Sequence, residues 1–249
     1  MALQKGIVKI EGTVGGLTFY KAGGEHLVRE KGGVSGDRIL NDPNFARTRE
    51  NNNEFGASGA AGKLLRDALR PLLMTAADNL VTSRVTTLMH NVMKQDVTSV
   101  RGKRTPAIGI ATVPGRSLLK GFNFNQSAVL GAVLYKPYVV APLTGVIAIA
   151  GLAPATDIAF PTGATHVSLT GAMASINFAT GAVDVKLTNV VSLAVGAAAA
   201  AVTLTPTAVP AGAGTKLFLL KIEFFQMVNA VQYPLKNGSY NALAIIETA

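Results

Sequence analysis

Short runs in which apolar and polar residues alternate open the chain. In "GIVKIEG" Ile7 and Lys9 alternate with Val8 and Ile10, and in "LTFYKA" Leu17 and Phe19 alternate with Thr18 and Tyr20. "HLVREK" is a third run, and glycines end each of the three. A period of two is typical of a half-buried β-strand, and glycine supplies the positive φ of tight turns. Residues 1–33 are therefore predicted to form a three-stranded meander that turns at Gly15-Gly16 and Gly23-Gly24.

The period becomes helical after about residue 41. Asn41 or Asp42 suits an N-cap and Pro43 suits the first helical position, so a helix is predicted through about Phe55. Between residues 61 and 92 the apolar side chains recur with helical spacing, and Pro71 interrupts the pattern. This pattern predicts two helices that pack as a hairpin.

The period of two returns after about residue 106. Strand candidates separated by Gly, Pro, Asn and Thr include "AIGIATV", "GVIAIAG", "THVSLTGAMASINFA" and "TKLFLLKIEFFQMV". Regular spacing of short strands is typical of an antiparallel sandwich or barrel. The predicted fold class is α+β, with N-terminal β-hairpins and a helical hairpin followed by an antiparallel β-sandwich or barrel.

Charge divides the chain unevenly. The net charge is +9, and residues 1–120 hold 18 Lys and Arg against 10 Asp and Glu, whereas residues 121–249 hold 5 against 4. This shift predicts a basic N-terminal region over 1–120 and a β-rich, sandwich-like domain over 121–249.

Composition indicates a protein that buries more surface than a monomer of this size. Hydrophobic residues make up 49% of the 249 residues and charged residues 15%. Self-association is the simple way to cover such a surface, so the predicted partner is the protein itself. The apolar stretch from Tyr138 contains Pro142 and Gly145, which favours two strands and a turn over a membrane span. The start has no apolar run typical of a signal peptide, which predicts a cytoplasmic or virion location and leaves non-classical release open.

No motif indicates a reaction. Cysteine is absent, and His26, His90 and His166 fall in separate segments without ligand spacing. Neither a dinucleotide-binding glycine pattern nor a P-loop nor a nucleophile elbow occurs. The sequence therefore predicts a non-enzymatic protein with no catalytic residue, no metal and no cofactor.

Basic residues cluster in "SVRGKRTP", which carries Arg101, Lys103 and Arg104. One interpretation is a nucleic-acid site in which these side chains contact phosphates, although no aromatic residues are interleaved for base stacking. The favoured interpretation is a subunit interface or domain junction in which arginines pair with carboxylates such as Glu50, Glu54 and Asp67.

The stretch "RTRENNNEFG" is dense in hydrogen-bonding groups. Three consecutive asparagines are poor helix formers, so they indicate either a solvated helix end or contacts to a neighbour, and contacts are favoured. The predicted subunit-contact residues combine this stretch with one hairpin strand: Leu17, Phe19, Tyr20, Arg47, Arg49, Glu50, Asn51, Asn52 and Asn53.

The order of motifs resembles an uncharacterised family of hypothetical proteins common in Bacteroidota genomes and their mobile elements. The motifs that carry the resemblance include "GTVGGLTFY", "HLVREKGGV", "NFARTRENNNEFG", "GFNFN" and "LFLLKIEFFQ". The resemblance spans nearly the whole chain and implies no activity. It implies that the hairpins, the arginine-asparagine helix and the last strand form one unit.

Together these patterns predict a non-enzymatic structural protein that self-assembles into a filament, tube or shell. The opening "GIVKIEG" and the closing "NALAIIETA" are candidate edge strands for pairing across subunits. The alternatives are a phage virion component, such as a tail-tube or capsid protein, and a nucleic-acid-binding protein that uses the basic N-terminal region.

Overall fold

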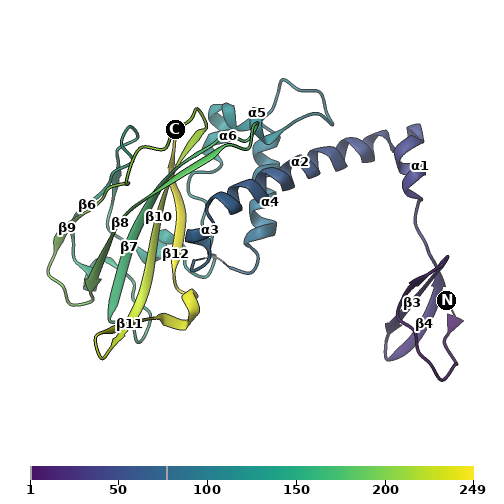
Figure 1. Ribbon diagram of the computed structural model, residues 1–249, viewed down its shortest axis with the longest axis horizontal. Helices are drawn as coiled ribbons and strands as arrows, with labels where there is room; N and C mark the ends of the chain where they lie inside the picture. The colour runs from purple at the N-terminus through teal and green to yellow at the C-terminus, as the bar shows by residue number, and fades with distance from the viewer. Residues whose placement is uncertain (1, 77) are drawn as a thin grey trace. The chain divides into compact units, whose positions relative to one another are not determined.

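A computed structural model describes residues 2–76 and 78–249, and the chain divides into two compact units, Met1–Arg49 and Glu50–Ala249 (Figure 1). The first unit is an antiparallel four-stranded sheet followed by two short helices. Its strand order is β1-β4-β3-β2. Its elements are β1 (Ala2–Leu3), β2 (Gly12–Val14), β3 (Leu17–Ala22), β4 (Glu25–Glu30), α1 (Gly36–Asn41) and the 3-10 helix η1 (Pro43–Phe45).

The hairpins of this sheet follow the predicted glycine turns, with φ of 58° at Gly15, 60° at Gly23 and 85° at Gly24. The strand predicted over residues 7–10 is wrong. Strands β1 and β2 form opposite edges of the sheet, so residues 4–11 have to pass from one edge to the other and leave the ladder. The Gln4 side chain holds this crossing through hydrogen bonds with the backbone N–H and C=O of Ile10.

Helix α2 (Ala46–Ala68) is one continuous helix where two were predicted. The side chain of Asp42 accepts a hydrogen bond from the Asn44 N–H, and Pro43 opens η1, as the capping pattern predicts. Helices α3 (Arg70–Leu73) and α4 (Val81–Met93) follow. Gly62 lies against Val85 and Thr86, so α2 and α4 pack together and the predicted helical hairpin is confirmed.

Residues 106–117 form helices α5 (Pro106–Ala111) and α6 (Val113–Ser117), so the strand predicted for "AIGIATV" is wrong. Thr105 and Thr112 each cap one of these helices through the side-chain oxygen. A Cβ on Gly109 would lie 2.0 Å from the Val92 carbonyl oxygen, so α5 approaches α4 at backbone contact. A short alternating pattern fits a strand or a helix equally well, and here the caps and the close approach of α5 to α4 favour the helix.

Two antiparallel sheets follow. In the larger one the order is β11-β10-β7-β8, and β12 also pairs with β10; in the smaller one it is β5-β6-β9. Their strands are β5 (Val139–Val140), β6 (Ile147–Leu152), β7 (His166–Ile176), β8 (Val183–Ala194), β9 (Ala200–Leu204), β10 (Thr215–Val228), β11 (Val231–Pro234) and β12 (Ala242–Thr248). Short helices α7 (Leu130–Val133), α8 (Pro154–Asp157) and η2 (Leu235–Gly238) connect them.

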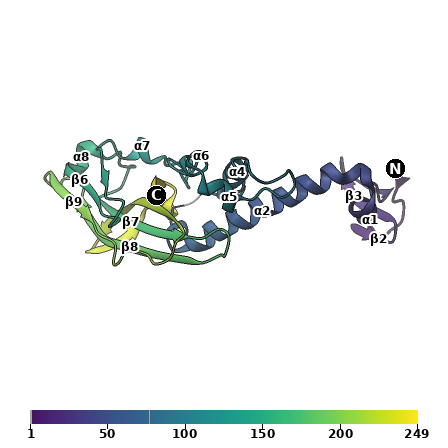
Figure 2. The same ribbon diagram turned by 90° about the horizontal axis from the view of Figure 1, so that it is seen from above.

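The larger sheet is covered on both faces, because its strands alternate between two cores. In β10 the side chains of Phe218 and Leu220 enter a core shared with β6 and β9, whereas Leu217 and Leu219 enter a core shared with α2 and α4. Figure 2 shows α2, α4 and α5 toward one side of β7 and β8, whereas β6, β9 and α8 lie toward the other. The two sheets form a sandwich, the α+β class is confirmed, and neither sheet closes into a barrel.

The division between units falls at Arg49 and Glu50, and the predicted boundary at 120 lies inside the second unit. The helices of residues 61–119 share a core with β7, β10 and β12, so they cannot form a domain apart from the sheets. The charge shift instead separates the N-terminal sheet and the helices from the strands of the sandwich. The last strand lies in the second unit and the hairpins in the first, contrary to the single unit that the resemblance implies.

Candidate functional site

One face of the N-terminal sheet gathers apolar side chains, beside the paired Lys21 and His26. Val14 pairs with Leu17 and Phe19 pairs with Val28, and residues paired across an antiparallel ladder point to the same side. We call Val14, Leu17, Phe19 and Val28 the N-terminal apolar face. Val14 is 64% exposed and Leu17 is 43% exposed, while Phe19 and Val28 are half-buried.

This sheet has no core of its own. Among residues 2–49, the described part of the first unit, no residue is buried, and both hydrophobic cores of the protein use residues from Ala61 onward. A small sheet becomes stable when its apolar face packs against a helix, another sheet or a partner. The N-terminal apolar face is therefore a candidate interaction surface.

Tyr20, the third hairpin residue predicted to contact a subunit, lies on the opposite face from Leu17 and Phe19. It pairs with Leu27 across the ladder, and the Arg29 guanidinium lies 5.2 Å from the centre of its ring. The predicted hairpin set is thus divided between the two faces of the sheet.

The predicted contact residues at the start of α2 have varied surroundings. Arg49 donates hydrogen bonds to the carbonyls of Ile39 (2.7 Å) and Asp42 (2.9 Å), so it ties down the preceding turn. Arg101 lies 3.4 Å from the Glu50 carboxylate and donates to the Asn51 side chain at 2.9 Å. The remaining three, Arg47, Asn52 and Asn53, are exposed on the helix.

Glu54 is the centre of the contact between α2 and the loop of residues 97–105. Its side chain is 3% exposed and accepts two hydrogen bonds of 2.7 Å from the Arg104 guanidinium. The Gly102 N–H donates to the same carboxylate at 2.7 Å. The Arg104 hydrogen bonds, aided by Gly102, outweigh burial and lower the pKa of Glu54 from 4.5 to about 2.

Asp96, three residues after the end of α4, holds the same loop. Its carboxylate accepts backbone hydrogen bonds from Thr98, Ser99 and Thr105 at 3.1, 2.9 and 3.1 Å. Burial opposes its ionisation, but these hydrogen bonds lower the pKa of Asp96 from 3.8 to about 2. The loop is therefore anchored at both ends by ionised carboxylates.

These contacts bear on the basic residues predicted for nucleic-acid binding. Arg104 and Arg101 are engaged by carboxylates within the chain, and Lys103 is exposed. The sequence predicted that arginines pair with Glu50 and Glu54, and the structure contains the pairs Arg101–Glu50 and Arg104–Glu54. Asp67, named with them, pairs instead with Lys63 on its own helix.

The closing strand is not a free edge. β12 pairs with β10 on one side, and on the other side its residues exchange backbone hydrogen bonds with residues 121–124. Of the two candidate edge strands, "GIVKIEG" is not a strand over 7–10 and "NALAIIETA" is covered. The open edges of the N-terminal sheet are the short strands β1 and β2.

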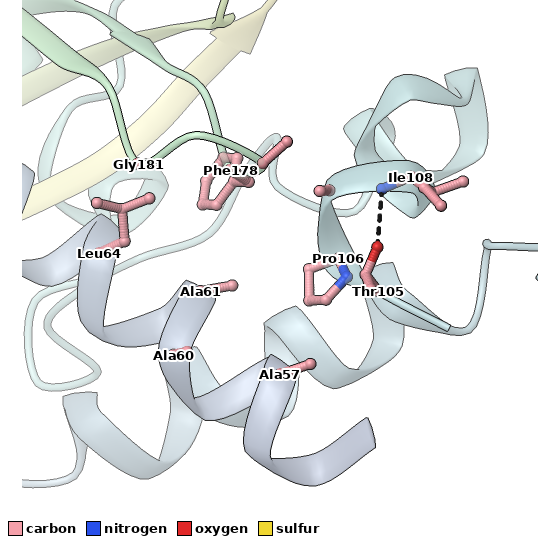
Figure 3. Close-up of a pocket in the computed structure, with 11 residues that line it drawn as sticks. Ala57, Ala60, Ala61, Leu64, Thr105, Pro106, Ile108, Phe178 and Gly181 are labelled. Carbon is pink, nitrogen blue, oxygen red and sulfur yellow. Dashed lines mark hydrogen bonds between the residues drawn. The ribbon is translucent and has the colours of Figure 1, made fainter. Parts of the chain in front are cut away.

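A second apolar surface lies within the second unit, and the sequence analysis missed it. Figure 3 shows Ala57 and Ala61 of α2, Pro106 of α5 and Phe178 of the β7–β8 turn around one hollow. We call this surface the α2–α5 groove; its volume is about 610 Å³. Ala60, Leu64 and Ile108 also line it, and the Thr105 hydroxyl at its margin accepts a hydrogen bond from the Ile108 N–H. The signal in the sequence is "GASGAAG", whose small side chains leave one helix face hollow.

Two features are absent from the described residues, a metal-binding cluster and a membrane-spanning helix. Across residues 2–76 and 78–249, no group of three or more His, Asp or Glu side chains is placed to hold a metal ion. Within the same ranges no helix is long and apolar enough to cross a membrane.

The fold defines an α+β protein in which a small, coreless sheet precedes a helix-backed β-sandwich. No family model matches the chain, and neither a curated protein nor a solved structure matches it.

Proposed function

We propose that the protein is a non-enzymatic structural subunit that self-associates through its N-terminal sheet. The observation that carries the proposal is the absence of any buried residue among the described residues 2–49, in a sheet with an apolar face. An exposed apolar face of this kind is typical of an interaction surface, and a further copy of the same chain is the partner that covers it.

The second unit supports the role of a rigid body in such an assembly. It has a core on each face of the larger sheet, and its charged loop is fixed by buried carboxylates. The assembly is a filament, tube or shell, of cellular or phage origin. A survey of neighbouring genes distinguishes a virion component, such as a tail-tube or capsid protein, from a cellular one.

Light scattering coupled to size exclusion tests the proposal when the nucleic-acid-free protein is measured over a wide concentration range. We expect a mass that exceeds the 25.7 kDa of one chain and grows with concentration. Negative-stain microscopy of the largest species should show regular fibres, tubes or shells. A constant mass of one chain at every concentration contradicts the proposal.

A further inference from the structure

Each unit has one apolar surface that the rest of that unit leaves exposed: the N-terminal apolar face in the first and the α2–α5 groove in the second. We propose that the N-terminal apolar face of one copy docks into the α2–α5 groove of the next copy. This inference rests on the proposed self-association and specifies its geometry. Because the two surfaces differ, the contact is head to tail, and a row of copies retains one free face at one end and one free groove at the other for further growth.

The groove suits an apolar protein surface better than a small ligand. Its volume of about 610 Å³ offers room for large side chains such as Leu17 and Phe19. Small-ligand sites generally combine apolar walls with a few convergent polar groups that orient the ligand. Here the walls are mainly Ala, Leu, Ile, Pro and Phe side chains, and the marginal Thr105 hydroxyl already caps α5.

Glu30 and Lys103 offer one pair of opposite charges for this contact, one on the N-terminal apolar face and one two residues from the groove-lining Thr105. Glu30 lies directly across from Leu17 in the ladder, so it stands on the apolar face, and it makes no ion pair within the described part of the chain. Lys103 is exposed two residues before Thr105, and among described residues it has no ion pair either. A docked copy would therefore bring a free carboxylate towards a free ammonium group, which favours the correct orientation.

Two full-length variants test the contact. The variant Leu17→Asp places a charge on the N-terminal apolar face and leaves the groove intact. The variant Ala60→Arg fills the α2–α5 groove and leaves the face intact. Leu143→Asp and Ala155→Arg are matched controls, because both residues are exposed and lie outside the face and the groove. We expect each test variant alone to remain monomeric and each control to assemble like the parent.

The decisive measurement is the mass of a mixture of the two test variants. The intact groove of Leu17→Asp should accept the intact face of Ala60→Arg, giving a 1:1 complex that grows no further. If the N-terminal sheets of two copies pair with each other, or if the groove binds a small apolar molecule, Ala60→Arg should still assemble by itself. Assembly of Ala60→Arg alone therefore overturns the inference.

A charge exchange gives a second readout. Glu30→Lys and Lys103→Glu should each weaken assembly about tenfold, and the protein that carries both changes should assemble nearly as well as the parent. Additive losses in the double variant contradict the pairing. If the parent assembles and both single variants assemble equally well, the inference fails but the proposed function stands. If the parent is monomeric at every concentration, both fail.

Discussion

At the scale of single residues, one carboxylate organises the junction between α2 and the loop 97–105. Both oxygens of Glu54 are occupied, one by Gly102 and Arg104 and the other by Arg104 alone. The composition of the basic stretch suggested that arginines pair with Glu50 or Glu54, but a linear sequence does not specify which residues 50 positions apart will meet. That choice depends on how the loop folds back on the helix.

Removing the Glu54 charge should destabilise the second unit strongly. In Glu54→Gln the half-buried Arg104 guanidinium loses its counter-ion, and breaking a buried pair from one side costs roughly 3 kcal/mol or more. Urea unfolding at pH 7 measures the change. Asp67→Asn is the matched control, because its exposed pair with Lys63 lies on one helix surface, and this variant should unfold like the parent. Equal unfolding of the two variants would contradict the role of Glu54.

Acid stability should depend on the same carboxylate. The pKa of Glu54 is lowered on folding from 4.5 to about 2, so its contribution is complete above pH 4.5 and is lost as the pH falls towards 2. Integrated over this range the loss is about 3 kcal/mol. The unfolding free energy of Glu54→Gln should consequently fall less steeply over this range than that of the parent. Parallel pH profiles would show that Glu54 titrates normally.

At the scale of elements, the helices that pack on the larger sheet are set by backbone contacts as well as by apolar periodicity. The strand predicted for "AIGIATV" failed because a short alternating run is ambiguous. The capping threonines, each followed by a proline in "TPAI" and "TVPG", were the local signal for helices. The approach of α5 to α4 at Gly109 is a tertiary contact, which no local signal contains.

Two glycine-to-alanine changes in helices should act in opposite directions. Gly109→Ala places a Cβ 2.0 Å from the Val92 carbonyl oxygen, so α5 has to move, at a cost of roughly 1–3 kcal/mol. Gly56→Ala adds a Cβ that meets nothing within 4 Å and removes backbone freedom from the unfolded chain, which should stabilise by roughly 0.5–1 kcal/mol. Urea unfolding of both variants at a concentration below assembly measures this contrast. A stabilising Gly109→Ala would contradict the packing described for α5.

At the scale of the whole molecule, the two units have different sources of stability. The second unit encloses two cores, whereas the described residues of the first unit enclose none. Composition predicted a basic front and an apolar back with a boundary near residue 120. The helices nevertheless belong with the sheets, because their apolar faces cover one face of the larger sheet.

Removing residues 1–33 should therefore leave a folded protein that no longer assembles. No core residue is lost, so the urea midpoint of the remaining chain should match that of the parent within error. Light scattering should report one chain at every concentration at which the parent is larger. Unchanged assembly after this truncation would show that the N-terminal sheet is not the contact surface.

The sequence by itself determined features that depend on near neighbours in the chain. These include the glycine turns of the N-terminal hairpins, the cap at Asp42, the helical hairpin and the long strands of the sandwich. The tertiary structure alone decided the partners of Glu54, the helical state of residues 106–117 and the place of the unit boundary. It also decided that the α2–α5 groove exists, since its walls come from segments more than 40 residues apart in the chain. Local patterns encode backbone conformation and which face is apolar, but the surface that covers each face is chosen when distant segments pack.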